Sequence, residues 1–169
     1  AVLEAFPERH ADHWLKVMRD KLGLDQNADV AVDRQLAKDF LELLRQRQID
    51  FTNAFRALYD AANGQAAPLR QLFGDDAHCA DWQKNWQTRQ PQRRPPLLTT
   101  MKHANPCYIA RNHQVEIALE AAVEDNDLAP FERLLAVLVQ PFDARTENAE
   151  YAEPAPWAVT ARYQTFCGT

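Results

Sequence analysis

Residues 49–64, IDFTNAFRALYDAANG, decide the fold class of this chain. The stretch begins with two residues that can cap a helix, Asp50 and Thr52, and ends in Asn63-Gly64, a pair typical of a helix end. Its apolar residues recur at the spacing of one helical face, namely at Phe55, Leu58, Tyr59 and Ala62. The pattern predicts an amphipathic helix that packs against other elements through its apolar side.

The same helical pattern recurs on both sides of this stretch. The other predicted helices run from Pro7 to a cap at Gly23, from about Asp33 to Arg47, within residues 67–74 and 75–89, from about Asn112, and from Pro130 to just before Pro141. No alternating apolar pattern long enough for a strand occurs. The predicted fold class is therefore all-α, an irregular multi-helix bundle with proline-rich connections and an extended C-terminal tail from Asp143 onward.

The helical spacing also predicts which residues face the core. In the two upstream helices these are Ala11, Trp14, Leu15, Met18 and Leu22, then Leu36, Phe40, Leu43 and Leu44. In the two downstream helices they are Val115, Leu119, Ala122 and Val123, then Phe131, Leu134, Leu135 and Leu138. Three further residues share a face at positions i, i+3 and i+7: Cys79, Trp82 and Trp86.

A proline-rich segment, PQRRPP at residues 91–96, breaks the helical pattern. It predicts a hinge between a first helical layer at residues 1–90 and a second layer with the tail at 105–169, joined by a connection at 91–104. Arg89, Arg93 and Arg94 form a basic cluster beside it, interpreted as a solvated linker.

Composition excludes several classes of protein. No apolar run approaches the ~20 residues that span a bilayer, and the N-terminal residues lack the order of a signal peptide. The net charge is -5 and mixed in sign, which argues against a nucleic-acid partner. Three cysteines without CxxC spacing favour a reducing compartment, so the cytoplasm is expected.

The sequence holds no glycine-rich phosphate loop, no GxSxG and no HExxH. His10 and His13 have a spacing that could seat a metal in a helical hydrolase, but no further ligand is nominated, so surface histidines and no metal site are predicted. Asp125, Asp127 and Glu132 lack the glycine and frame of a calcium loop, and Asp127 is expected to cap the helix at Pro130.

The most informative stretch is NPCYIARNH at residues 105–113. Asn105 and Pro106 predict a turn, Tyr108 and Ile109 are expected to be buried, and Arg111 and Asn112 stand where a helix begins. A structural role for Arg111 is favoured, and the alternative is that it binds a phosphate or carboxylate.

The three cysteines fall into two groups. Cys79 and Cys107 are predicted to be core residues. Cys167 lies third from the C-terminus, where its neighbours Gly168 and Thr169 cannot shield it, so it is either idle or reactive.

Several stretches in order resemble the C-terminal portion of the selenoprotein O family. They are KLGL at 21–24, DFTNAFRAL at 50–58, NPCYIARNH at 105–113, PF at 141–142 before an acidic stretch and Tyr151, and the terminal CGT. The resemblance implies that this chain is the C-terminal helical region of a larger bacterial protein with a kinase-like fold. That family transfers AMP from ATP to serine, threonine or tyrosine hydroxyls of proteins.

The resemblance also implies where the chemistry lies. The catalytic and metal-binding motifs of the family are absent here, so no catalytic residue is expected in this chain, and ATP and Mg²⁺ are implied only for the longer protein. The position of Cys167 matches the family's near-terminal redox residue, which is thought to pair with a cysteine of the kinase domain. The role of Asn105, Pro106, Tyr108, Arg111 and Asn112 stays unassigned.

Two hypotheses follow. In the first, the chain supports the upstream kinase-like lobe of a protein adenylyltransferase, whose other partners are protein substrates, and it delivers Cys167. In the alternative, it is an independent helical interaction domain without catalysis, which meets a partner through PQRRPP and through Trp82 and Trp86.

Overall fold

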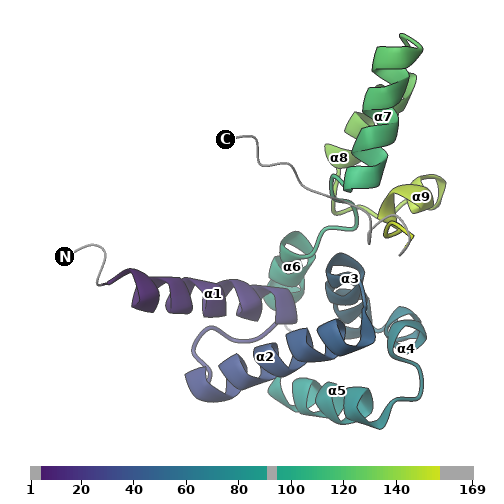
Figure 1. The fold of residues 1–169 in the computed structure, drawn as a ribbon. Helices are drawn as coiled ribbons and strands as arrows, with labels where there is room; N and C mark the ends of the chain where they lie inside the picture. Colours follow the sequence, from purple (N-terminus) through teal and green to yellow (C-terminus); the bar gives the residue numbers. More distant parts are fainter. Residues whose placement is uncertain (1–4, 91–94, 157–169) are drawn as a thin grey trace. The chain divides into compact units, whose positions relative to one another are not determined.

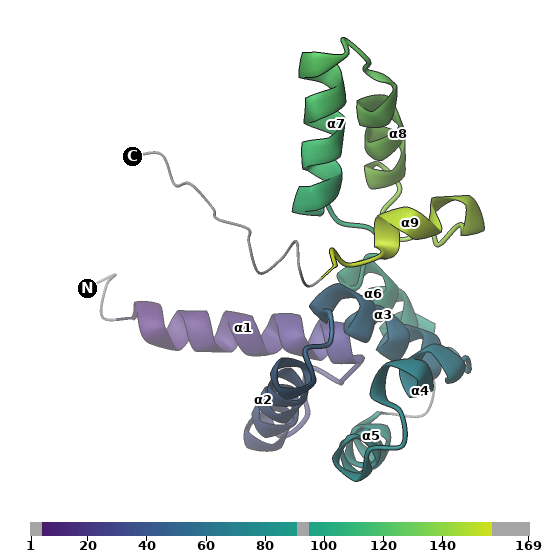
Figure 2. The same ribbon diagram turned by 45° about the vertical axis from the view of Figure 1, so that its right-hand side comes forward.

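A computed structural model describes residues 5–90 and 95–156, which form helices and no strand (Figure 1 and Figure 2). The all-α prediction is confirmed. In chain order the helices are α1 (Phe6–Leu22), α2 (Val30–Arg47), α3 (Phe51–Ala62), α4 (Ala67–Phe73), α5 (Ala77–Arg89), α6 (Pro95–Ala104), α7 (Asn112–Glu124), α8 (Ala129–Leu138), the 3₁₀ turn η1 (Thr146–Asn148) and α9 (Ala149–Ala152). Within these residues no helix is long and apolar enough to cross a membrane.

The chain divides into two compact units, Ala1–Pro106 and Cys107–Thr169. The first unit contains α1 to α6, and the second contains α7, α8, η1 and α9. Each unit is described by itself below, and the expected arrangement in two layers stays a prediction.

Aspartates begin three helices of the first unit. Asp29 accepts hydrogen bonds from two backbone N–H groups of α2, Asp50 accepts one from Asn53 N–H at 2.9 Å, and Asp76 accepts one from Cys79 N–H at 3.1 Å. Each carboxylate satisfies N–H groups that a first helical turn leaves without a partner. The predicted cap at Asp50 is confirmed, whereas α2 begins at Val30, three residues before the expected start at Asp33.

Gly23 ends α1, as predicted. Its φ of 67° lies in the left-handed region, and the backbone N–H of Leu24 donates to the carbonyl of Arg19 at 2.9 Å. A Cβ at this glycine would lie 2.9 Å from the sulfur of Met101 on α6. The absence of a side chain therefore allows both the turn and the close approach of α6.

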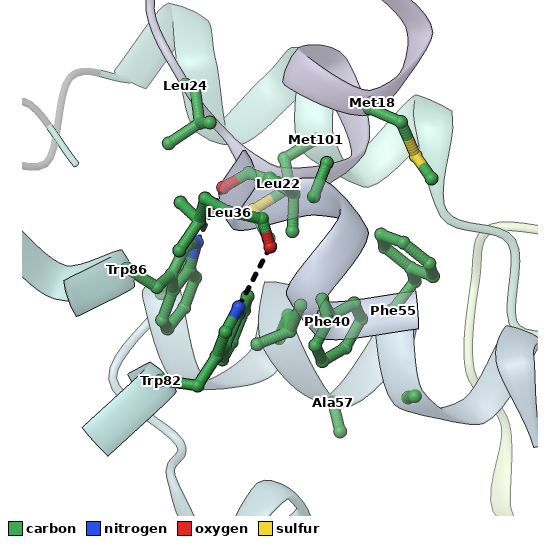
Figure 3. Close-up of a cluster of buried hydrophobic side chains, with 14 of the residues drawn as sticks. Met18, Leu22, Leu24, Leu36, Phe40, Phe55, Ala57, Trp82, Trp86 and Met101 are labelled. Atoms are coloured by element: carbon green, nitrogen blue, oxygen red, sulfur yellow. Dashed lines mark hydrogen bonds between the residues drawn. The ribbon is translucent and has the colours of Figure 1, made fainter. Parts of the chain in front are cut away.

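The core of the first unit gathers around Phe40 of α2 (Figure 3). The Phe40 ring stacks on Trp82 with centroids 4.4 Å apart and meets Phe55 edge-on at 5.0 Å. The indole N–H of Trp82 donates to the carbonyl of Leu36, and that of Trp86 donates to the carbonyl of Leu22. These contacts hold α5 against α2 and against the end of α1.

This packing overturns one expectation of the alternative hypothesis. Trp82 and Trp86 are both buried, so they form no outward face for a partner. Cys79, which shares their helical face, is buried as predicted.

Residues 95–104 differ from the expected connection because they form helix α6. Pro95 and Pro96 stand in the first turn, where a missing N–H costs nothing. Met101 of this helix is fully buried, and α6 packs against α1 and α3.

In the second unit, α7 and α8 lie side by side in both views (Figure 1 and Figure 2). Its core consists of Cys107, Tyr108, Ala118, Leu134, Val137 and Tyr151. The expected inward faces of these two helices are partly wrong. Leu119 and Val123 of α7 and Phe131 and Leu135 of α8 are exposed, while Ala118 and Val137 take the inward positions.

The expected irregular tail also contains structure. Residues 146–152 form η1 and α9, and Tyr151 of α9 is buried in the core of the second unit. Cys167 lies outside the described residues.

Candidate functional site

The signature segment, residues 105–113, runs from the end of α6 into the first turn of α7 and spans the boundary between the two units. Its first two residues belong to the first unit and the others to the second. The contacts on each side are therefore described separately.

On the first side, Asn105 joins the end of α6 to the end of α1. Asn105 is 1% exposed, and its side-chain amide donates to the carbonyl of Lys21 at 2.8 Å. Lys21 returns two hydrogen bonds from Nζ, to the carbonyl of Ala104 at 2.7 Å and to Oδ1 of Asn105 at 3.3 Å. Pro106, which follows, is half-buried. The turn predicted from Asn105-Pro106 is thus held by a reciprocal pair of side chains.

The Lys21 ammonium lies against two aromatic rings of α3. Nζ is 5.4 Å from the ring centroid of Phe51 and 5.1 Å from that of Phe55. These distances permit cation–π attraction, while burial lowers the pKa of Lys21 below its ordinary value. Lys21 therefore links α1, α3 and the end of α6, a role that explains why a lysine precedes Leu22 and Gly23.

On the second side, the backbone of the segment binds the chain around Pro141. The N–H groups of Cys107 and Tyr108 both donate to the carbonyl of Pro141, at 2.6 and 3.2 Å. The hydroxyl of Tyr108 accepts from the N–H of Arg145 at 2.8 Å and donates to the carbonyl of the same residue at 3.2 Å. Tyr108 is buried, as predicted, and fixes the start of η1. The expectation that Ile109 is buried was wrong, because this segment contributes Cys107 and Tyr108 to the core and leaves Ile109 exposed.

Arg111 is buried directly before α7. Its Nη2 donates to the carbonyl of Ala152 at 2.9 Å, and its own carbonyl accepts from the N–H groups of Gln114 and Val115 at 3.0 Å each. These contacts tie the start of α7 to the end of α9, which matches the structural role favoured for Arg111. Asn112 is the first residue of α7 and is exposed.

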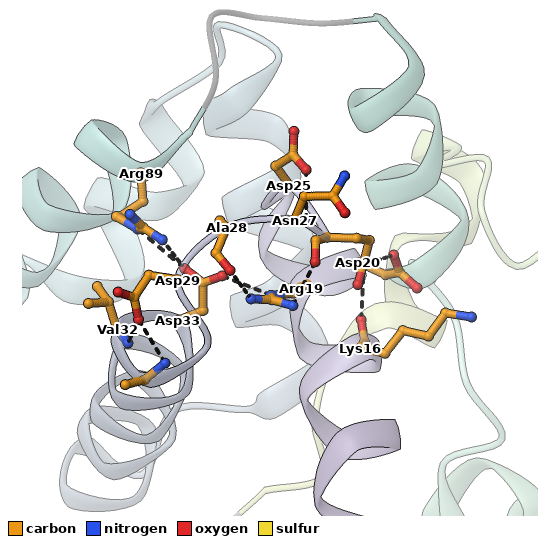
Figure 4. Close-up of polar contacts among 12 residues, drawn as sticks. Lys16, Arg19, Asp20, Asp25, Asn27, Ala28, Asp29, Val32, Asp33 and Arg89 are labelled. Atoms are coloured by element: carbon orange, nitrogen blue, oxygen red, sulfur yellow. Dashed lines mark hydrogen bonds and ion pairs between the residues drawn. The ribbon is translucent and has the colours of Figure 1, made fainter.

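A buried ion-pair cluster in the first unit was missed by sequence reasoning (Figure 4). Asp33 is fully buried and accepts from Arg19 Nε at 2.8 Å and from Arg89 Nη2 at 2.6 Å. Arg19 also donates to the carbonyls of Gln26 and Ala28, at 2.8 and 2.7 Å. The cluster joins α1, α2 and α5, and its two arginines share the single carboxylate of Asp33.

Arg89 is therefore not part of a solvated basic linker, contrary to expectation. Arg93 and Arg94 lie outside the described residues. The signal that could have found the cluster is the position of Asp33, which precedes Leu36 and Ala37 by three and four residues on the inward face of α2.

The structure brings no further metal ligand to His10 and His13 within the described residues. His10 and His13 are exposed on α1, and no group of three or more His, Cys, Asp or Glu side chains in the described residues is arranged to hold a metal. Asp127 accepts from the N–H of Ala129, the first residue of α8, at 2.9 Å, but Leu128 and not Asp127 occupies the N-cap position. Asp125 and Glu132 are exposed.

Burial raises the pKa of the Cys79 thiol, with the nearby Asp76 carboxylate as a further cause. A raised pKa keeps a thiol protonated and slow to react. Cys107 is buried as well.

An open groove of about 390 Å³ lies between α1 and α6, lined by Asp20, Thr99, Thr100, His103 and Ala104. Two of its hydroxyls are already engaged, because Thr99 donates to the carbonyl of Pro95 and Thr100 to that of Pro96, each at 3.1 Å. Its acidic and basic side chains have partners in the chain as well, because Asp20 accepts from the side chain of Gln26 at 2.8 Å and Nδ1 of His103 lies 2.8 Å from the carbonyl of Thr99.

Comparison with known proteins finds one family model and a set of relatives similar to this chain. A family model described as "Protein adenylyltransferase SelO" matches residues 1–139. Proteins named "Protein nucleotidyltransferase YdiU" are 45% identical in Cereibacter sphaeroides, 42% in Rhodococcus jostii and 40% in Chromobacterium violaceum. The matches cover 99–100% of this chain but 32–35% of these relatives, so the chain spans about a third of their length. The matched third is their C-terminal part.

Proposed function

The chain belongs to the protein adenylyltransferase SelO family, and we propose that it is the C-terminal helical region of an enzyme that transfers AMP from ATP to serine, threonine or tyrosine hydroxyls of proteins. In that reaction a hydroxyl oxygen forms a bond to the α-phosphorus of ATP and pyrophosphate leaves. The observation that carries the proposal is the family match over residues 1–139, together with relatives named as protein nucleotidyltransferases that are about three times as long as this chain.

The role proposed for this region is support of a kinase-like lobe that lies outside the chain. The contacts of the signature segment favour such a role. Asn105, Tyr108 and Arg111 all donate hydrogen bonds to backbone carbonyls of this chain. Side chains committed to their own backbone shape a scaffold and leave few groups to bind a substrate.

We place ATP and Mg²⁺ in the kinase-like lobe. The part of the chain that the structure describes offers no cluster of three carboxylate, imidazole or thiolate ligands, and the sequence has no glycine-rich loop to hold phosphates. The described residues therefore do not fit either group, and the proposal assigns them no step of the reaction.

Cys167 is proposed to be a redox residue of the full-length protein. Cys79 and Cys107 are both buried, so neither is a suitable partner, and the proposed partner is a cysteine of the kinase-like lobe. Two thiols would lose two electrons and two protons to an oxidant such as hydrogen peroxide and form a disulfide.

The test of AMP transfer compares this 169-residue chain with the full-length protein that contains it. Each is incubated with Mg²⁺, a mixed protein acceptor and ATP labelled at the α-phosphate. The full-length protein should label the acceptor and this chain should not. ATP labelled at the γ-phosphate is the control, because its label is retained only in phosphate transfer. Labelling by this chain alone, or by neither protein, would contradict the proposal.

The redox role has a separate test. In the full-length protein, Cys167→Ser should remove any change in AMP transfer between oxidising and reducing buffer, and Cys79→Ser is the control. An unchanged redox response in Cys167→Ser would exclude the switch and leave the transferase proposal intact.

A further inference from the structure

Helix α8 carries a row of exposed apolar side chains. Leu128, Phe131, Leu135 and Val139 are spaced by three, four and four residues, so they lie along one side of the helix. None of them belongs to the core of the second unit, which takes Leu134 and Val137 from the adjacent side of α8.

Helix α7 continues this apolar surface. Leu119 and Val123 are exposed and four residues apart, and the inward side of α7 is marked by Ala118. In an antiparallel pair of right-handed helices that face each other through Ala118 and Leu134, the helical phase puts Leu119 on the same side of the pair as Phe131. The six exposed residues, with exposed fractions of 45–82%, form what we call the apolar face.

The surface of α7 that points away from α8 carries glutamates, with the exposed Ile117 beside them. Glu116, Glu120 and Glu124 are exposed and follow one another at four-residue spacing. Charged residues therefore border the apolar face, and the exposed Ile117 lies apart from it. Single exposed apolar residues are common on monomers, but a contiguous group of six on two adjacent helices marks an interaction surface.

Resting on the proposed function, we propose that the apolar face is the surface on which the kinase-like lobe of the same protein docks. About two thirds of the length of the relatives lies outside this chain, so a covalently linked partner of sufficient size exists. The second unit also needs a packing partner to cover its apolar face. Its core has six buried residues, and helices of 13 and 10 residues are too short to be stable without packing.

A second copy of the chain is a less suitable partner for the apolar face than the kinase-like lobe. Stable interfaces between separate proteins use roughly 20–30 residues on each side, whereas the apolar face has six. A lobe in the same polypeptide is held at high effective concentration, so a small apolar patch is enough to keep it in place. The surface of the lobe that meets this face should be apolar and should lack carboxylates.

The experiment measures how accessible the face is in two forms of the protein. Leu135→Cys is introduced into the 169-residue chain and into the full-length protein, and its modification by a maleimide is followed by site-resolved mass spectrometry. Glu120→Cys, at an exposed glutamate on the surface of α7 that points away from α8, is the matched control. Leu135 is exposed in this chain, so the substitution removes no core contact.

We expect the cysteine at position 135 to react at least tenfold more slowly in the full-length protein, while the cysteine at position 120 reacts at similar rates in both. Equal rates at 135 would overturn the proposal. Slow reaction at 135 in this chain that becomes faster on dilution would also overturn it, because a second copy would then be the occupant.

Two further measurements keep the result interpretable. If Leu135→Cys misfolds, the hydrogen exchange of the 169-residue chain and of the full-length protein, both without substitution, tests the docking proposal. Docking should slow amide exchange in α8 of the full-length protein. AMP transfer by the same full-length preparation separates the two proposals. Transfer with an open apolar face refutes docking alone, whereas a covered face without transfer refutes the proposed function.

Discussion

At the scale of single residues, Asp33 is the most constrained group in the first unit. It is fully buried between the guanidinium groups of Arg19 and Arg89. Asp33→Ala leaves Arg19 buried without its carboxylate, so we expect the free energy of unfolding to fall by about 3–5 kcal/mol. Urea unfolding followed by the fluorescence of Trp82 and Trp86 measures this loss.

The matched control for that prediction is Asp39→Ala, a carboxylate exposed on the same helix. Its loss should change the free energy of unfolding by no more than about 0.5 kcal/mol. Equal effects of the two substitutions would show that the buried cluster contributes nothing particular to stability.

Asp60 of α3 gives a prediction about pH. Burial raises the pKa of its carboxyl above the ordinary value, against the opposing charge of Arg56 at 3.4 Å. The folded state therefore binds the proton more tightly than the unfolded state, and stability falls as pH rises from the unfolded to the folded pKa. Asp60→Asn removes this loss, so its stability relative to the unsubstituted chain should rise across that window and then level off. Urea unfolding at a series of pH values tests it, and a difference that shrinks with rising pH would contradict it.

At the scale of helices, the sequence predicts where a helix begins and ends better than it predicts which side of the helix faces the core. The caps at Gly23 and Asp50 follow from local chemistry that one turn of helix contains. The inward side of α7 and α8 could not be predicted in the same way, because both helices carry apolar residues on two sides. Which side is inward depends on Tyr108 and Tyr151, which reach this core from segments outside both helices.

Gly23 yields the prediction at this scale. Gly23→Ala places a side chain on a left-handed backbone, which costs about 1–2 kcal/mol, and its Cβ would lie 2.9 Å from the buried sulfur of Met101. We expect a total loss above 2 kcal/mol in the free energy of unfolding. In a Met101→Ala background the same substitution should cost only the backbone part. Equal costs in both backgrounds would show that the close approach of α6 does not matter.

At the scale of the whole molecule, the sequence identified the signature segment but not its partners. Residues 105–113 could be singled out because they combine a turn, an arginine and a helix start. Their contacts with Pro141, Arg145 and Ala152 join positions more than thirty residues apart, and no local pattern encodes such pairs. The same holds for Asp33 and Arg89, which are 56 residues apart.

The division into two units predicts that they lose structure in separate steps. Leu134 is buried in the core of the second unit, so Leu134→Ala should destabilise that unit by about 2–5 kcal/mol. In a Trp157→Phe background the remaining tryptophans all lie in the first unit, and their fluorescence transition should stay within about 0.5 kcal/mol of the parent value. Hydrogen exchange of α8 amides should report the loss of stability in the second unit.

Phe40→Leu is the reciprocal variant, which should shift the fluorescence transition and leave the hydrogen exchange of α8 unchanged. If either substitution shifts both readouts equally, the two units unfold as one cooperative body, and the boundary at Pro106 has no energetic meaning.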